Sequence, residues 1–120
     1  MQVKELTLND TVELMNSPDY KERFCAEYIQ TKIRYERLKA FNTRIEAARE
    51  TKGSEKAVPM PEHDCPDDML IEQQHTMGKY LHLLEVRAVI EGIDLDVAMR
   101  HCAMLADKES GYCQAVKKEG

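Results

Sequence analysis

The sequence predicts an all-α protein, built as a long antiparallel helical hairpin with a short N-terminal helix and a third, C-terminal helix. Two long segments carry apolar residues at the spacing of a helix seam. A proline-containing stretch that lacks this periodicity separates the two segments. Charged residues make up 32% of the chain and aromatic residues only 6%, a composition typical of helical proteins.

The first long helix is expected over residues 18–51. Its seam steps by four and three residues, and neither glycine nor proline interrupts it. The seam residues are Phe24, Tyr28, Thr31, Tyr35, Leu38, Asn42 and Ile45. Ser17 is a favourable N-cap, and Pro18 fits the first helical position. Residues 1–17 are expected to form a lead-in and a brief helix, which is too short to be stable unless it packs on something larger.

Residues 52–65 are expected to form a loop, because Pro59 and Pro61 forbid helix and Gly53 can end the preceding one. The second long helix is expected over residues 66–92. Its seam residues are Leu70, Gln74, Met77, Leu81, Leu84 and Ala88.

The end of this second helix is apolar nearly all round, from Leu81 to Ile93. Such a helix is central in its bundle or buried in an oligomer. The chain is therefore expected to be a single domain, residues 1–120, that completes a bundle by self-association, most simply as a dimer. Asp94 can cap a third helix over residues 94–108, and residues 109–120 are expected to be a frayed tail.

Charge is unevenly spread along a chain whose net charge is −5. Residues 20–52 carry nine Lys and Arg against five Asp and Glu, whereas residues 53–120 carry seven against thirteen. One interpretation is that the basic helix pairs with the acidic segments, with Arg44 and Arg49 beside Asp67 and Asp68. The other is that its basic face holds an anionic ligand.

The candidate residues for a ligand or partner site are arginines with neighbouring aromatic residues. They are Arg34, Tyr35, Arg37, Phe41, Arg44 and Arg87. Three of the arginines share a stripe of the first long helix, where guanidinium groups can grip phosphate or carboxylate in a fork. Arg87 lies in the apolar run LLEVRAVIEGI and needs an acceptor, because a buried unpaired charge is costly. Glu91 or Glu85 could supply that acceptor, and so could a group outside the chain.

No motif in the chain indicates catalysis, a metal site or a cofactor. The cysteines Cys25, Cys65, Cys102 and Cys113 form no CxxC pair and no zinc-binding spacing. We therefore expect no enzyme activity, no metal and no required disulfide. With no signal peptide or membrane-spanning stretch, the cytoplasm is the expected location. Direct nucleic-acid binding is disfavoured, because the third helix carries few basic residues, Arg100 and Lys108 near its middle.

The phrases SPDYKERF, AEY, KIRYE and LEVRAVIEGI, within residues 10–93, resemble small helical proteins of bacteriophages and prophages of Gram-positive bacteria. The hairpin is also similar, by analogy, to phage helical-hairpin proteins that sequester cyclic nucleotide signals. These resemblances imply a counter-defence inhibitor that blocks a host immune protein or sequesters its nucleotide messenger. The alternatives are a structural or interaction accessory protein of phage development and a weak nucleic-acid-binding module.

Overall fold

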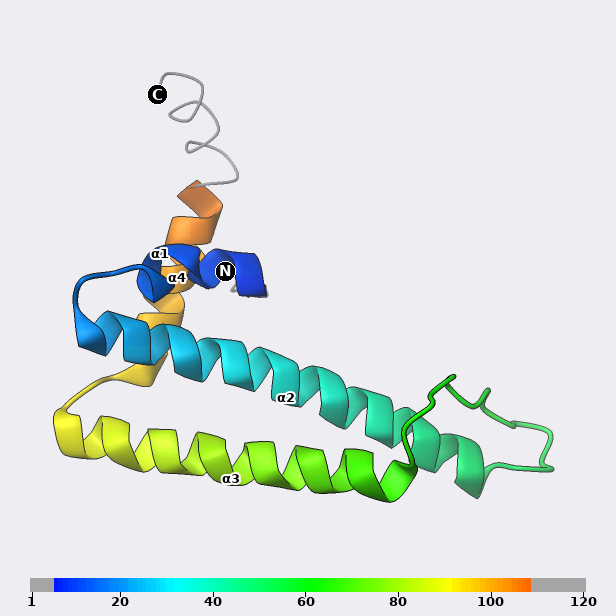
Figure 1. Cartoon of the computed structure of the whole chain (residues 1–120). Helices are drawn as coiled ribbons and strands as arrows, with labels where there is room; N and C mark the ends of the chain where they lie inside the picture. Colours follow the sequence, from blue (N-terminus) through cyan, green and yellow to red (C-terminus); the bar gives the residue numbers. More distant parts are fainter. Residues whose placement is uncertain (1–5, 109–120) are drawn as a thin grey trace.

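The computed structural model describes residues 6–108 of the chain, with side chains as far as Met104, and it confirms the all-α fold. The expected frayed tail, residues 109–120, and the first five residues lie outside the described residues. The described helices are a 3-10 helix η1 (Leu8–Thr11), α1 (Val12–Met15), α2 (Tyr20–Glu50), α3 (Asp67–Glu91) and α4 (Leu95–Lys108). Helices α2 and α3 run antiparallel along most of their length, as Figure 1 shows.

Helix α2 begins two residues later than expected, at Tyr20 instead of Pro18. Asp19 is the N-cap, and its side chain accepts a hydrogen bond from the Lys21 backbone N–H at 3.0 Å. Ser17 accepts from the backbone N–H of Asp19 and donates to Glu22. The helix therefore begins at Tyr20, because an aspartate carboxylate occupies the capping position two residues beyond Ser17.

The ends of α3 and α4 follow from local chemistry. Gly92 ends α3 with a φ of +70°, a left-handed conformation that costs glycine little. Asp94 then caps α4, since its Oδ1 accepts from the Val97 backbone N–H at 3.0 Å. The chain turns sharply between these residues, so α4 leaves the hairpin instead of extending it (Figure 1).

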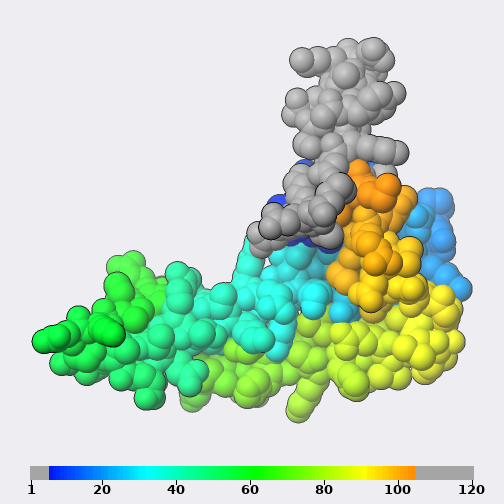
Figure 2. Space-filling model, turned by 180° about the vertical axis from the view of Figure 1, so that it is seen from behind, coloured from blue at the N-terminus to red at the C-terminus, as the bar shows by residue number. Residues whose placement is uncertain are grey.

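The main core lies at the end of the hairpin where α2 begins and α3 ends. Its buried members come from α1, α2, α3 and α4. They are Leu14, Phe24, Cys25, Ala26, Tyr28, Ile29, Leu81, Leu84, Ala88 and Cys102. Figure 2 shows α4, in orange, standing against this end of the hairpin. Thus α2 is covered by α3 on one side and by the N-terminal helices and α4 elsewhere along its first half.

Two polar or small residues set how α2 and α3 fit together. The buried Asn42 side chain donates to the Leu70 carbonyl at 3.2 Å and to Gln74 Oε1 at 2.9 Å. Gly78 lets α3 approach the ring of Tyr35, because a Cβ added there would meet Tyr35 Cε1 at 3.3 Å. Tyr35 therefore packs between the helices, and Asn42 pins their relative position.

Cys102 anchors α4 to the N-terminal helices and stays protonated well beyond neutral pH. Its side chain is fully buried, and Sγ donates to the Asp10 carbonyl at 3.1 Å. Burial raises the pKa of the Cys102 thiol from 9.0 to about 11. Burial and a hydrogen bond to Glu85 also raise the pKa of Tyr28.

We expect the free energy of unfolding to fall as the pH rises from 9 to 11. In that window the unfolded Cys102 thiol loses its proton while the folded thiol keeps it, so the unfolded state is favoured by about 2 kcal/mol at most. Urea unfolding followed by circular dichroism at pH 8, 9, 10 and 11 measures this. Cys102→Ala should be less stable at pH 8 and should show a shallower decline. An equally steep decline in the variant would contradict this assignment.

Candidate functional site

A groove lies between α2, α4 and the residues that precede η1. It is located where the N-terminal helices and α4 cease to cover α2. Its volume is about 810 Å³. The residues that line it are Leu6, Thr7, Ile29, Lys32, Ile33, Glu36, Arg37, Ala40, Asp96, Met99 and Arg100. A cavity of roughly 300–1,000 Å³ suits a small organic ligand, so the groove has the size of a ligand site.

The floor of the groove is apolar and rests on the core. Ile29 is 1% exposed, while Ile33, Met99 and Leu6 are half-buried and pack against the core residues. A flat apolar group of a ligand would displace water from this floor and contact aliphatic and thioether side chains. Burial of that kind is favourable in proportion to the apolar area removed from water.

The rim of the groove is charged, with cations in excess. Lys32 and Arg37 come from α2 and Arg100 from α4, against the acidic Glu36 and Asp96. Within residues 6–108, the structure shows no ion pair or hydrogen bond for the side chain of any of the three cations, and Lys32 does not pair with Glu36, which follows it by four residues on α2. These cations are therefore available to an anion that enters the groove.

The structure disperses the six residues that the sequence suggested. Arg37 lines the groove, whereas Arg34 is exposed on α2 outside it and Tyr35 packs against Gly78. Arg44 continues the stripe of Arg37 two turns along α2, beyond the groove. Its guanidinium carbon lies 5.5 Å from the centroid of the Phe41 ring, which in turn meets the His63 ring edge-on at 5.9 Å.

Arg87 has partners within its own chain. Its Nε and Nη2 donate to Glu91 Oε2 at 3.0 and 2.9 Å, and its guanidinium carbon lies 4.7 Å from the centroid of the Phe24 ring. Tyr20 donates to the other oxygen of the same carboxylate at 2.8 Å. The hydrogen bonds from Tyr20 and Arg87 lower the pKa of Glu91. The internal acceptor considered in the sequence is thus the one used, and Arg87 ties α3 to the beginning of α2.

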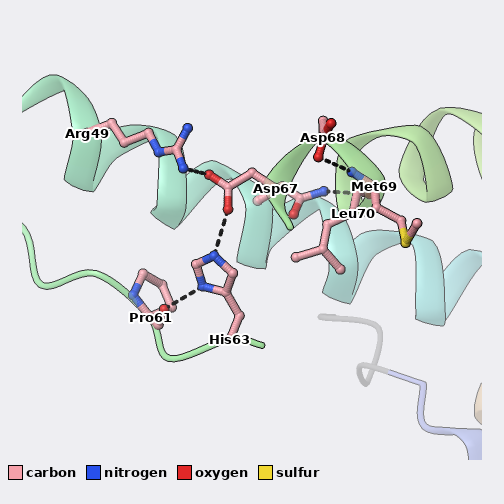
Figure 3. Close-up of polar contacts among 8 residues, drawn as sticks. Arg49, Pro61, His63, Asp67, Asp68, Met69 and Leu70 are labelled. Atoms are coloured by element: carbon pink, nitrogen blue, oxygen red, sulfur yellow. Dashed lines mark hydrogen bonds and ion pairs between the residues drawn. The ribbon is translucent and has the colours of Figure 1, made fainter. Parts of the chain in front are cut away.

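The interpretation that the basic helix pairs with acidic segments applies at the far end of the hairpin, which Figure 3 shows. Arg49, at the end of α2, pairs with Asp67 at the beginning of α3. His63 Nε2 lies 2.6 Å from Asp67 Oδ1, and its Nδ1 lies 2.8 Å from the Pro61 carbonyl oxygen. Both neighbours are acceptor oxygens, and an imidazole N–H can donate to either of them. This cluster fastens the loop to the hairpin.

Sequence reasoning missed Lys32, Asp96, Met99 and Arg100 as parts of a site. Asp96, Met99 and Arg100 are spaced i, i+3, i+4, so they share one face of α4. Lys32 and Arg37 lie on the face of α2 that α4 crosses. The spacing of these residues is visible in the sequence of each helix. The sequence does not show that α4 crosses α2 and brings the two faces together.

Other kinds of site find no support in the part of the chain that the structure describes. In residues 6–108, no three His, Cys, Asp or Glu side chains gather where they could hold a metal ion. Over the same residues, no helix has both the length and the apolar character that crossing a membrane requires.

Among the described residues, the hairpin thus carries a groove of small-molecule size with an apolar floor and three cations that have no ion-pair partner, features that are common in ligand-binding sites. The model of the Sequestin family matches residues 18–90, which is more than half of the chain, and the chain belongs to this family. The match covers α2, the loop and nearly all of α3. The family name indicates a protein that sequesters what it binds. The searches of curated proteins and of solved structures returned no match.

We expect Arg87→Ala to lower the free energy of unfolding by about 1 kcal/mol. The change removes two charge-assisted hydrogen bonds and the cation–π contact with Phe24, all of them partly exposed to water. Arg34→Ala is the matched control and should change stability by less than about 0.5 kcal/mol. Thermal and urea unfolding of both variants measures this. Equal stability of the two variants would show that the Arg87 contacts contribute nothing.

Proposed function

We propose that this protein is a counter-defence binder that sequesters a nucleotide-type anionic messenger of the bacterial host in the groove between α2 and α4. The observation that carries the proposal is a set of three cations, Lys32, Arg37 and Arg100, that have no ion-pair partner among the described residues and line an apolar groove of about 810 Å³. The membership of a family named for sequestration supports a binding role.

The groove offers a separate place for each part of a nucleotide. The guanidinium groups of Arg37 and Arg100 match phosphate oxygens in a forked geometry, and Lys32 adds a point charge. The apolar floor of Ile33 and Met99 suits the face of a base. Glu36 and Asp96 accept hydrogen bonds, so they can pair with base amino groups or ribose hydroxyls.

The acidic residues also explain why a simple inorganic anion is a poor fit. Glu36 and Asp96 share the rim with the cations and would repel a bare phosphate. A ligand that combines phosphate with hydrogen-bond donors satisfies both signs of charge. The groove therefore favours an organic phosphate over a free ion.

The alternative within the same role is that the protein blocks a host immune protein directly. Such partners are commonly recognised over surfaces of about 800 Å² per partner, much larger than this concave groove. The cavity therefore favours a small molecule. We infer no catalysis, and the proposed mechanism is stoichiometric removal of the messenger.

We expect Arg37→Ala and Arg100→Ala each to weaken ligand binding about 30-fold or more, since each leaves a desolvated phosphate charge without its partner. Arg44→Ala is the matched control, because Arg44 follows Arg37 at i+7 on α2 but lies outside the groove. Isothermal titration with linear and cyclic mono- and dinucleotides measures the affinity, and melting temperatures verify that all variants fold. Equal losses in Arg37→Ala and Arg44→Ala would refute the groove as the site.

The role in cells has its own test. Wild-type protein should protect a phage from a host defence that signals through a nucleotide, and Arg37→Ala should not. Metabolites released by heating protein recovered from infected cells should contain the messenger in about equimolar amount. Protection by Arg37→Ala equal to that by wild type would show that the protein acts in another way.

A further inference from the structure

The outer face of α3 carries apolar side chains that no described element covers. Leu83 is 61% exposed, Val86 43%, Val89 82% and Ile90 77%. They lie on the side of α3 opposite its buried face, Leu81, Leu84 and Ala88, which packs on α2. Figure 1 shows α2 on one side of α3 and none of the other described helices on the far side. A contiguous apolar surface of this kind marks an interaction site.

Two hollows of opposite charge flank this apolar face along α3. Toward the beginning of the helix, a hollow of about 630 Å³ is lined by Tyr35, His75, Gly78, Lys79, His82 and Leu83. It contains one lysine and two histidines and no acidic residue. Toward the end of the helix, a hollow of about 470 Å³ is lined by Tyr28, Glu85, Ala88, Val89, Gly92, Ile93, Asp94, Leu95 and Asp96. It contains three acidic residues and no cation.

The order of these features along α3 is self-complementary. Val86 lies near the middle, with Leu83 before it and Val89 and Ile90 after it. Lys79 lies seven residues before Val86, and Asp94 lies eight residues after it. A two-fold axis through Val86 that sets two copies of α3 antiparallel therefore places Leu83 on Val89 and Ile90 of the other copy. The same operation places Lys79 just past the end of the other α3, beside the turn that carries Asp94.

We propose that this face binds a second copy of the chain, in an antiparallel two-fold dimer in which each basic hollow receives the acidic end of the other α3. The helical part of the contact runs from His75 to Glu91, about 24 Å at 1.5 Å per residue, and Asp94 and Asp96 follow after the turn at Gly92. A standard interface buries about 800 Å² per partner, which is roughly 30 Å across. A two-fold contact uses the same patch on both copies, as this face requires.

The carboxylate of Asp94 can accept a lysine of the second copy in addition to capping α4. Asp94 uses one oxygen to cap α4, where it accepts from Val97, and a carboxylate retains further lone pairs for a lysine. His82 Nδ1 lies 3.9 Å from Glu85 Oε1, and the side chains of His82 and Glu85 are 76% and 49% exposed. The dimer contact shares one residue, Asp96, with the groove between α2 and α4, and each dimer carries two such grooves.

We expect sedimentation equilibrium of the wild-type chain at about 50 µM to give a dimer. Val89→Glu should weaken the dimer at least 100-fold, because it buries two like charges near the axis. Val89 is already 82% exposed, so the monomer should keep its helical content by circular dichroism. Val58→Glu, the same change in the loop, is the control and should leave the dimer intact. A wild-type monomer at 100 µM, a Val89→Glu dimer, or open-ended assembly would each overturn the proposal.

The charge arrangement can be tested separately from the apolar contact. Lys79→Glu should weaken the dimer about tenfold, and adding Asp96→Lys to it should restore most of the affinity. Asp96 is chosen because Asp94 caps α4. Lys39→Glu on the exposed side of α2 is the control for a charge reversal outside the interface. Failure of the double variant to recover would rule out the antiparallel two-fold arrangement.

Discussion

The packing of the first half of α2 against the last half of α3 is the constraint on which the rest of the structure depends. Phe24 and Tyr28 are buried there against Leu84 and Ala88. Fully burying each large side chain contributes about 1.5–3 kcal/mol, more than any surface ion pair in the hairpin. Because α2 is covered by α3 at this end, its opposite side is free to receive the N-terminal helices and α4. The groove forms where the N-terminal helices and α4 end and α2 continues with α3 packed beside it.

The charges of the hairpin are used in two different ways. At the loop end, Arg49 pairs with Asp67, so part of the basic character of α2 is neutralised within the fold. Near the middle of α2, Lys32 and Arg37 have no such partner in residues 6–108. The two interpretations of the uneven charge are therefore compatible, because they concern different turns of one helix.

The hairpin was predictable because its cause is local. Periodic apolar residues and breaks at Gly53, Pro59 and Gly92 are visible without any knowledge of the tertiary contacts. The partner of Arg87 was predictable in the same way, since Glu91 follows it by four residues on the same helix. The groove was not predictable, because it depends on the angle at which α4 crosses α2. Helical periodicity carries no information on that angle, so Arg100 was not connected with Arg37.

Asn42 fixes the alignment of α2 with α3 from inside the hairpin. Its side-chain amide donates to two acceptors on α3, while its Oδ1, although buried, has no hydrogen-bond partner in the described residues. Sliding one helix past the other by a turn would strand the donors as well, which is costly in an apolar interior. The alignment of the hairpin is thus set inside the helices and not by the connection between them. Residues 52–65 of this chain can accordingly be lengthened or shortened while α2 and α3 keep the same neighbours.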